Sequence, residues 1–309
     1  MDFDSISPML AAPVPLEKVD KYSDYYMEVK LDGVRCVAVK SNYVITLWTR
    51  QGNNITDKLP HIVAELDKIQ GDWVLDGELG FLKYPEEPLP CYPEDLKLPH
   101  FIDFNATMRV IGSSAQLAID KHKNYLVNGW APMHFVIFDI TYAQGRSVIS
   151  TAHSARREML IHMFNLYWFD NISLSYAWIN WDPKIYAQVI GEGGEGVMLK
   201  NPNSVYLPGK RRANTWYKVK AFDTVDCMIT DKEPGKGKYE GQIGALVAQD
   251  PTGRDVRISG MTDTMRKEMT DNFSDYVGKH VEVRYFGKVG LNQDGYRHPQ
   301  FIRMRPDLD

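Results

Sequence analysis

The hexapeptide Lys30-Leu31-Asp32-Gly33-Val34-Arg35 lies near the start of this 309-residue chain and brings a lysine, an acid, a glycine and an arginine together. A lysine is normally protonated at neutral pH, so Lys30 can act as a nucleophile only where its surroundings favour the neutral amine. Arg35 and a divalent metal on bound phosphates would both favour the neutral amine by lowering the pKa of Lys30. Gly33 lets the backbone turn closely beneath a ligand. The pattern predicts a lysine that attacks phosphorus; a strand end with solvated charges is the alternative.

Six short motifs follow the hexapeptide in a fixed order. They are Thr49-Arg50-Gln51-Gly52, Asp76-Gly77-Glu78, Phe135-Val136-Ile137-Phe138-Asp139, Glu195-Gly196-Val197-Met198-Leu199-Lys200, Trp216-Tyr217-Lys218-Val219-Lys220 and Arg297-His298-Pro299-Gln300-Phe301-Ile302-Arg303-Met304-Arg305. Each is weak alone, but the ordered set resembles the covalent nucleotidyltransferase superfamily and, within it, the small, phage-type ATP-dependent DNA ligases. The resemblance extends from about Pro8 to Asp307.

The first part of the chain, to about Phe222, has α+β patterning. Short strands are predicted at 26–29, 36–39 and 43–49, and helices at 62–69, 114–126, 151–164 and 183–190. Gly191, Gly193 and Gly194 can end the last helix and deliver the chain to a strand carrying Glu195. The resemblance implies that residues 1–222 form an adenylation, or nucleotidyltransferase, domain.

The pattern after residue 223 changes to strands separated by turns. Strands are predicted at 225–230, 244–248, 256–258, 280–285 and 300–304, with one helix at 261–272. This length suits a small five-stranded barrel, and the resemblance implies an OB-fold domain over residues 223–309. The linker is expected at 221–224, and no further N-terminal DNA-binding domain is expected.

Composition agrees with two buried cores, since 44% of the residues are apolar. No apolar run approaches the ~20 residues that span a bilayer, and residues 1–4 do not begin a targeting signal, so we expect an intracellular, cytoplasmic monomer. The spacing of Cys36, Cys91 and Cys227 suggests neither a zinc site nor disulfides.

The net charge of −4 argues weakly against a nucleic-acid partner, because phosphate binding needs clustered cations. Local clusters can still differ in sign. Acids gather within 84–99, which reads as an irregular proline-rich loop, and bases gather at Lys210, Arg211 and Arg212 and at Lys232, Lys236 and Lys238.

The resemblance implies that Lys30 attacks the α-phosphate of ATP to form a lysine-linked AMP. Glu78 and Glu195 are then the carboxylates for Mg²⁺ (or Mn²⁺) and the ribose, since hard cations prefer oxygen ligands. Lys218 and Lys220 are two apart on a predicted strand, so they point to one face and can hold one phosphate. Without Lys30 and Glu195, a solvated strand edge would be the better interpretation.

The nucleotide-binding set implied by the family has further members. Arg35 and Arg50 would contact the nucleotide or the nick phosphate. Phe138 would stack on adenine, although a core phenylalanine is the commoner outcome for such a position. Glu28 shares a strand face with Lys30 and sits where the family recognises the base, but an exposed strand acid would look the same.

The terminal motif places Arg303 and Arg305 on the same face of a predicted strand, where they could close over the β- and γ-phosphates. The family often continues with x-Asp-Lys, whereas here Asp307 is followed by Leu308. Candidates for contacting DNA are Arg109, within 105–109, and Lys236 and Lys238; each could equally be ordinary surface.

These features predict an ATP- and Mg²⁺-dependent DNA ligase acting on nicked double-stranded DNA in three nucleotidyl-transfer steps. An RNA guanylyltransferase of the capping type shares the lysine motif and the barrel, but the terminal motif resembles the ligase version. An inactive nucleic-acid-binding barrel protein is the third possibility. ATP is favoured over NAD because the cysteine quartet and extra domains of NAD-dependent ligases are absent.

Overall fold

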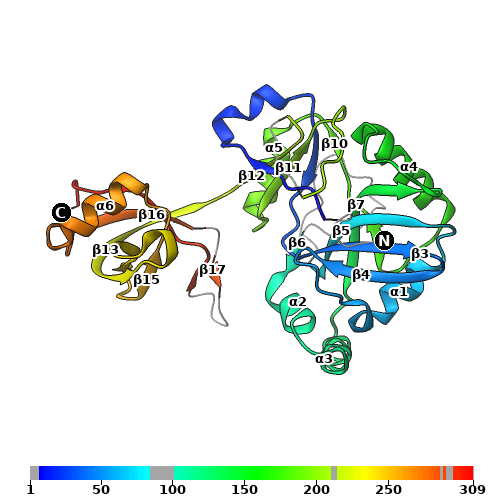
Figure 1. Cartoon of the computed structure of the whole chain (residues 1–309), viewed down its shortest axis with the longest axis horizontal. Coiled ribbons are helices and arrows are strands. Elements are labelled where there is room, and N and C mark those ends of the chain that lie inside the picture. The colour runs from blue at the N-terminus through cyan, green and yellow to red at the C-terminus, as the bar shows by residue number, and fades with distance from the viewer. Residues whose placement is uncertain (1–6, 84–100, 210–213, 286–287, 290–294, 309) are drawn as a thin grey trace. The chain divides into compact units, whose positions relative to one another are not determined.

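The computed structural model describes residues 7–83, 101–209, 214–285, 288–289 and 295–308. Contacts divide the chain into two compact units, Met1–Lys220 and Ala221–Asp309 (Figure 1). The expected loop at 84–99, Cys91 and the basic residues Lys210, Arg211 and Arg212 lie outside the described residues. No helix in the described part is long and apolar enough to cross a membrane.

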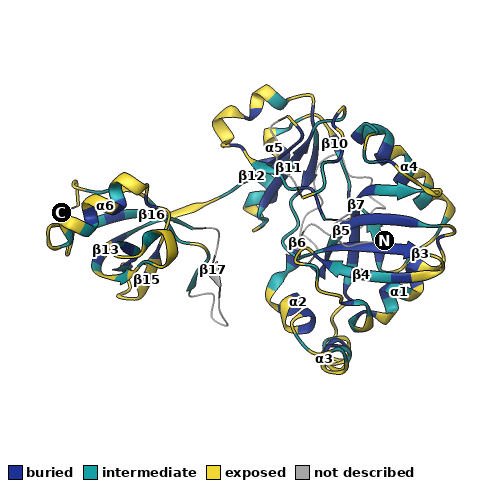
Figure 2. Ribbon diagram, in the orientation of Figure 1, coloured by how far each residue is buried: buried dark blue, intermediate teal, exposed yellow. Residues whose placement is uncertain are grey.

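The larger sheet of the first unit has the strand order β4-β3-β5-β7-β8, with β6 paired to β5 and β9 to β7. These strands are β3 (Val34–Ser41), β4 (Val44–Thr49), β5 (Trp73–Lys83), β6 (Phe101–Asp103), β7 (His134–Ala143), β8 (Arg146–Ser147) and β9 (Ile172–Leu174). The helices are α1 (Pro60–Asp67), α2 (Phe104–Ile111), α3 (Ala115–Val127) and α4 (His153–Leu166), with the 3-10 turn η3 (Thr56–Lys58). Side chains from the sheet and these helices form one buried core, which the dark strands of Figure 2 mark.

The second sheet of this unit has the order β1-β12-β11-β2-β10. Its elements are β1 (Ala12–Pro13), β2 (Tyr26–Val29), β10 (Trp178–Ile179), β11 (Gly196–Lys200) and β12 (Trp216–Lys220), together with helix α5 (Pro183–Gly191) and the 3-10 helix η2 (Leu16–Tyr22).

Alternation along these strands separates a core face from a polar face. On the core face Met27, Leu199 and Tyr217 lie across from one another and pack with α5 residues in a separate apolar cluster. One residue further along, Glu28 and Lys218 flank Met198 on the opposite face. Because successive side chains of a strand point to opposite faces, burial of the first set fixes where the charged second set lies.

The second unit is a small barrel with the order β15-β14-β13-β16-β19. Its elements are β13 (Asp223–Pro234), β14 (Ile243–Gln249), β15 (Asp255–Ile258), β16 (His280–Tyr285), β17 (Lys288–Val289), β18 (Gly295–Tyr296), β19 (Gln300–Met304), α6 (Asp263–Asp271), η4 (Gly237–Tyr239) and η5 (Phe273–Asp275). A bridge between Ser259 and Gln300 joins the end of β15 to β19 and closes the sheet. This strand order agrees with the small five-stranded barrel expected from the sequence.

The predicted helices are all present, with ends shifted by at most three residues. Helix α2 was not predicted. Its N-cap is Asp103, whose carboxylate accepts a hydrogen bond from the Ala106 amide at 2.9 Å. The segment at 105–109, treated as a phosphate-contacting stretch, therefore belongs to a helix.

Candidate active site

Lys30 follows the last residue of β2 and forms an ion pair with Glu195, which directly precedes β11. Lys220, at the end of β12, forms an ion pair with the other oxygen of the same carboxylate. The Lys30 amide also donates to the Gly196 carbonyl at 2.9 Å. Although burial opposes it, the two ammonium groups hold the pKa of Glu195 below its usual value. Three motifs that are far apart in sequence thus meet at one carboxylate.

Glycines bring Glu195 to this position. Helix α5 ends at Gly191, and Gly193 has a φ of +85°, a left-handed conformation that suits glycine after a helix. Gly196 has a φ of +139°, and a Cβ there would overlap the Val219 carbonyl oxygen. Glu195 therefore lies one residue before the strand that was expected to carry it.

Glu78 lies on β5 directly across from Arg35 on β3. Its Oε1 accepts a hydrogen bond from the Gly33 amide at 3.2 Å. Burial raises the pKa of Glu78 to about 7, while Arg35 and Lys30 act to lower it. Because Gly33 follows Lys30 by three residues, its hydrogen bond places Glu78 beside the loop that carries Lys30.

The carboxylates of this site fit a cation that arrives with phosphates better than a preformed metal centre. No group of three or more metal-ligating side chains occurs in the described part of the chain. Glu78 and Glu195 supply two carboxylates, and Mg²⁺ in proteins commonly uses one or two carboxylates together with substrate phosphates and waters. The residues present therefore suit Mg²⁺ bound to a nucleotide.

Arg35 is held by an acid of the neighbouring strand, a partner that the hexapeptide alone does not reveal. Its Nε and Nη2 donate to the two carboxylate oxygens of Asp76, each at 2.6 Å, and Nη2 also lies 3.3 Å from the Met9 carbonyl. The guanidinium carbon lies over the Phe138 ring, 4.6 Å from its centroid. Asp76 is 1% exposed, so this pair is a strong restraint on the guanidinium.

Arg50 and Lys218 occupy the positions expected from their strands. Arg50 is exposed in the turn just past Thr49, which pairs with Cys36, the residue after Arg35. Lys218 shares a strand face with Lys220 and lies across from Met198.

Glu28 is buried, with only 2% of its surface exposed. Its Oε2 accepts hydrogen bonds from Ser175 Oγ and Lys200 Nζ, both at 2.8 Å, and Arg157 Nη1 lies 3.6 Å from Oε1. Arg157 Nη2 in turn donates to the Ser175 carbonyl at 2.7 Å. The side chain is therefore not an exposed strand acid, and its role in recognising the base stays a prediction.

Phe138 is half-buried at the edge of a small apolar cluster with Met9, Tyr206 and Trp216. Its ring makes an edge contact with Trp216, and Lys200 Nζ lies 4.5 Å from its centroid. The ring packs in a cluster and remains partly accessible, and its stacking on adenine stays a prediction.

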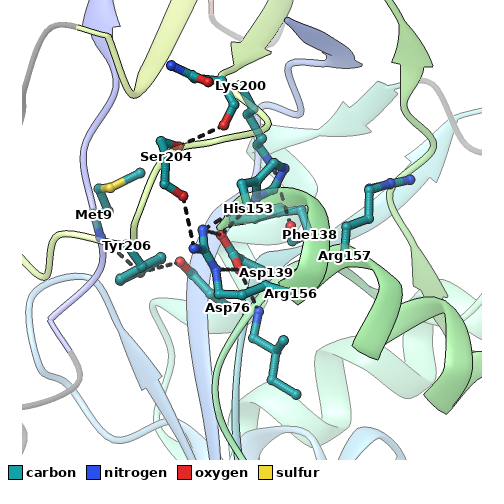
Figure 3. A network of polar contacts seen from close by, with 12 residues as sticks. Met9, Asp76, Phe138, Asp139, His153, Arg156, Arg157, Lys200, Ser204 and Tyr206 are labelled. Atoms are coloured by element: carbon teal, nitrogen blue, oxygen red, sulfur yellow. Dashed lines mark hydrogen bonds and ion pairs between the residues drawn. The ribbon is translucent and has the colours of Figure 1, made fainter. Parts of the chain in front are cut away.

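A buried ion cluster supports the strand that carries Phe138 (Figure 3). The Asp139 carboxylate accepts hydrogen bonds from Arg156 Nε and Nη2 at 2.7 and 2.9 Å. Asp139, Arg156 and His153 are all 0% exposed. Arg156 also donates to the carbonyls of Thr151 and Ser204. These contacts fix β7, α4 and the segment after β11 to one another.

Arg303 and Arg305 lie in the second unit, and both are held by acids of that unit. Arg303 pairs with Glu282 at 2.6 Å, whereas Arg305 pairs with both oxygens of Asp226 at 2.8 and 2.9 Å and with Asp307. Strand β19 ends at Met304, so Arg305 lies just beyond the strand on which it was expected.

The candidate DNA contacts are all exposed. Arg109 lies near the end of α2 in the first unit. In the second unit Lys236 directly precedes η4 and Lys238 lies within it. Lys238 pairs with Asp263 at 3.2 Å.

Comparison with known proteins assigns both units. Residues 8–220 match the model of the ATP dependent DNA ligase domain, and residues 234–305 match that of the DNA ligase OB-like domain. The chain belongs to the ATP-dependent DNA ligase family. The α+β architecture expected from the sequence, an adenylation domain followed by an OB-fold domain, is confirmed by these matches.

Two curated archaeal relatives are named as DNA ligases. DNA ligase 2 of Methanosarcina mazei is 28% identical over 341 residues, covering 100% of this chain and 56% of that protein. The DNA ligase of Archaeoglobus fulgidus is 29% identical over 310 residues, covering 92% of this chain and 52% of that protein. The chain thus spans about half the length of these relatives.

Solved structures share the fold. A structure from work on DNA binding by Lig E DNA ligases has a TM-score of 0.69 at 21% identity and covers 97% of this chain and 99% of that one. The ligase domain of M. tuberculosis LigD has a TM-score of 0.52 at 20% identity, covering 99% and 97%.

Several residues of the site were not assigned from the sequence. Lys200 and Asp139 stand in the recognised motifs, but a motif does not say which partners its members contact. Arg157, Ser175 and Tyr206 lie outside the motifs, and no local signal distinguishes them from ordinary polar or aromatic residues.

Proposed function

We propose that this chain is an ATP-dependent DNA ligase that seals nicks between a 5′-phosphate and a 3′-hydroxyl in duplex DNA. The observation that carries the proposal is the convergence of Lys30, Glu78, Glu195 and Lys220 in one site of a unit that matches the ligase domain. The intermediates would be lysyl-AMP and 5′-adenylated DNA.

In the first step the Lys30 amine attacks the α-phosphate of ATP, a nitrogen–phosphorus bond forms, and pyrophosphate leaves. An ion pair requires the ammonium form, so Lys30 must release a proton before it attacks, and Glu195 is the acceptor in contact with it. Lys218 and Lys220 would hold phosphate oxygens. Mg²⁺ (or Mn²⁺), held by Glu78 and Glu195, would supply charge that stabilises the departing pyrophosphate.

The later steps use the same site. AMP passes from Lys30 to the 5′-phosphate of the nick, and the 3′-hydroxyl then displaces AMP. Arg35 and Arg50 adjoin the same strand pair, Cys36–Thr49, and would contact phosphates of the nucleotide or nick. Phe138 would support the adenine, and Glu28 would recognise it through Oε1, which has no hydrogen-bond partner among the described residues.

The second unit would contribute Arg303 and Arg305 to the triphosphate, and these must first leave Glu282 and Asp226. Nicked DNA is the proposed partner, with Arg109, Lys236 and Lys238 as candidate phosphate contacts. A single chain carries every proposed residue, so we propose that the protein acts as a monomer. We also propose a cytoplasmic location, because ATP and DNA are found inside cells.

The decisive experiment incubates the protein with Mg²⁺ and α-labelled ATP or GTP and resolves it on a denaturing gel. We expect label from ATP to stay on the wild-type chain and on Lys184→Ala, an exposed lysine on α5, and to be absent from Lys30→Ala. Nicked DNA added to the adenylated protein should be sealed.

Other outcomes would point elsewhere. Label from GTP alone favours an RNA guanylyltransferase, and sealing of nicked RNA but not DNA changes the substrate. A wild-type protein that never acquires label, with fresh nucleotide and metal, contradicts the proposal.

A further inference from the structure

We propose that the Tyr206 hydroxyl is a positioning group for Arg35, acting through Asp76, and that it sets the rate at which Lys30 becomes adenylated. This inference rests on the proposed function. Tyr206 lies outside every motif that identified the family, on the segment that follows β11. It is 3% exposed, so its hydroxyl is not available for direct contact with a substrate.

The hydroxyl joins three distant segments of the first unit (Figure 3). It lies 2.5 Å from Asp76 Oδ2 and 2.9 Å from the Met9 amide nitrogen. Arg35 donates to both oxygens of the same Asp76 carboxylate and to the Met9 carbonyl. Tyr206 and Arg35 are therefore linked twice, once through Asp76 and once through Met9.

The direction of these hydrogen bonds follows from their partners. The Met9 amide can only donate, and an Asp76 carboxylate paired side-on with a guanidinium accepts. The hydroxyl must therefore accept from Met9 and donate to Asp76. No other arrangement satisfies both neighbours, so the hydroxyl fixes the carboxylate in one orientation.

Fixing Asp76 also fixes Arg35. Four contacts restrain Arg35, namely the two oxygens of Asp76, the Met9 carbonyl and the face of the Phe138 ring. These contacts use Nε and Nη2 and leave Nη1 as the corner of the guanidinium directed away from Asp76. A rigid cation placed before the substrate arrives stabilises developing phosphate charge without reorganisation.

The Tyr206 ring has a separate structural role. It packs with Met9 and Trp216, and its backbone amide donates to the Ile149 carbonyl at 2.8 Å. Tyr206→Phe keeps these contacts and removes only the hydroxyl. The variant therefore separates positioning of Arg35 from support of the fold.

The test measures the single-turnover rate of lysine adenylation with Mg²⁺ and α-labelled ATP over a range of ATP concentrations. We expect Y206F to lower the maximal rate about tenfold, as loss of one hydrogen bond to a charged group does. In an Arg35→Ala background the same change should have no further effect, because Tyr206 acts only through Arg35.

Tyr25→Phe is the matched control. Tyr25 is 6% exposed, and its hydroxyl accepts from Asn201 Nδ2 at 3.1 Å, in the apolar cluster on the other face of the sheet. Y25F should lose similar stability in thermal unfolding and adenylate at the wild-type rate. Should Y206F fail to fold, Asp76→Asn takes its place in the same double-variant test.

If the wild-type chain forms the adduct, two results would overturn the role of Tyr206 and leave the proposed function intact. One is a Y206F rate equal to that of the wild type; the other is an equal loss with and without Arg35. A wild-type chain that forms no adduct would instead overturn the proposed function, and this inference with it.

Discussion

At the scale of single residues, the first unit repeatedly uses one buried acid to hold two groups. Glu195 holds Lys30 and Lys220, and Asp76 holds Arg35 and Tyr206. Buried acids of this kind are retained only where hydrogen bonds and opposite charges compensate for lost hydration. Loss of the acid would leave partly buried cations without a counter-charge, so these acids also position the cations of the site.

Buried histidines predict how stability depends on pH. His122 Nε2 accepts from the Met133 amide at 3.0 Å, and the ring stacks on His61 with centroids 4.5 Å apart. Burial, assisted by His61, lowers the pKa of His122 to about 4. An unfolded histidine titrates near ~6.5, so below that pH the unfolded chain binds a proton that the folded chain excludes.

The stabilising contribution is therefore complete above about pH 6.5 and is lost as the pH falls toward 4, at up to about 1.4 kcal/mol per pH unit. Urea unfolding at pH 7, 6 and 5 should show that the free energy of unfolding falls less with pH in His122→Gln than in the wild type. The glutamine amide oxygen can still accept a hydrogen bond from the Met133 amide. His162→Gln, at an exposed position, should follow the wild type. Parallel losses in H122Q and wild type would contradict this.

At the scale of elements, the register of β2, β11 and β12 places the charged groups. Apolar side chains of these strands pack beneath α5, and alternation then directs Glu28, Lys218 and Lys220 to the other face. A shift of one residue would exchange the two faces, so the site depends on the start of β11 at Gly196.

Two glycines near Glu195 provide a matched test of this register. Gly196→Ala would place a Cβ against the Val219 carbonyl, whereas Gly193→Ala meets no atom within 4 Å. We expect G193A to cost about 1 kcal/mol for its left-handed backbone and to keep lysine adenylation. G196A should be more destabilising and should lower adenylation by an order of magnitude or more. Unfolding curves measure the stability of both variants, and adduct yields measure their adenylation. Equal stability and equal adenylation of G193A and G196A would contradict the dependence of the site on this register.

At the scale of the whole molecule, each unit has its own apolar core. The first unit contains Lys30 and the carboxylates, and the second contains Arg303 and Arg305. Independent cores of this size commonly fold alone, so the chemistry can be divided experimentally.

A chain ending at Phe222 should therefore fold, bind ATP and adenylate Lys30 much more slowly than the full chain. Circular dichroism and thermal unfolding test the fold, and adduct formation tests the rate. The full-length double variant Arg303→Ala/Arg305→Ala should show a comparable loss. If the short chain adenylates Lys30 at the full rate, Arg303 and Arg305 take no part in the first step.

Many strands and helices were predictable from the sequence, because apolar and polar residues alternate regularly where one face of an element is buried. Strands β2, β16 and β19 begin and end as predicted, and the helix ending before the glycines at 191–194 is α5. Helix α2 was missed, because its short apolar stripe follows a proline-rich segment without a clear boundary. The surroundings of Arg35 and Glu28 were also missed, since their partners come from other elements.

The sequence by itself determined the family and the order of the two folds, and it predicted Lys30 as the nucleophile, because these depend on residue types at fixed local spacing. Only the tertiary structure decided that Arg35 is held by Asp76, that Glu28 is enclosed by Lys200 and Arg157, and that Tyr206 joins Met9 to Asp76. The physical reason is that a buried charge selects its partners by distance and lost hydration, and both are set by chain segments that are distant in the sequence.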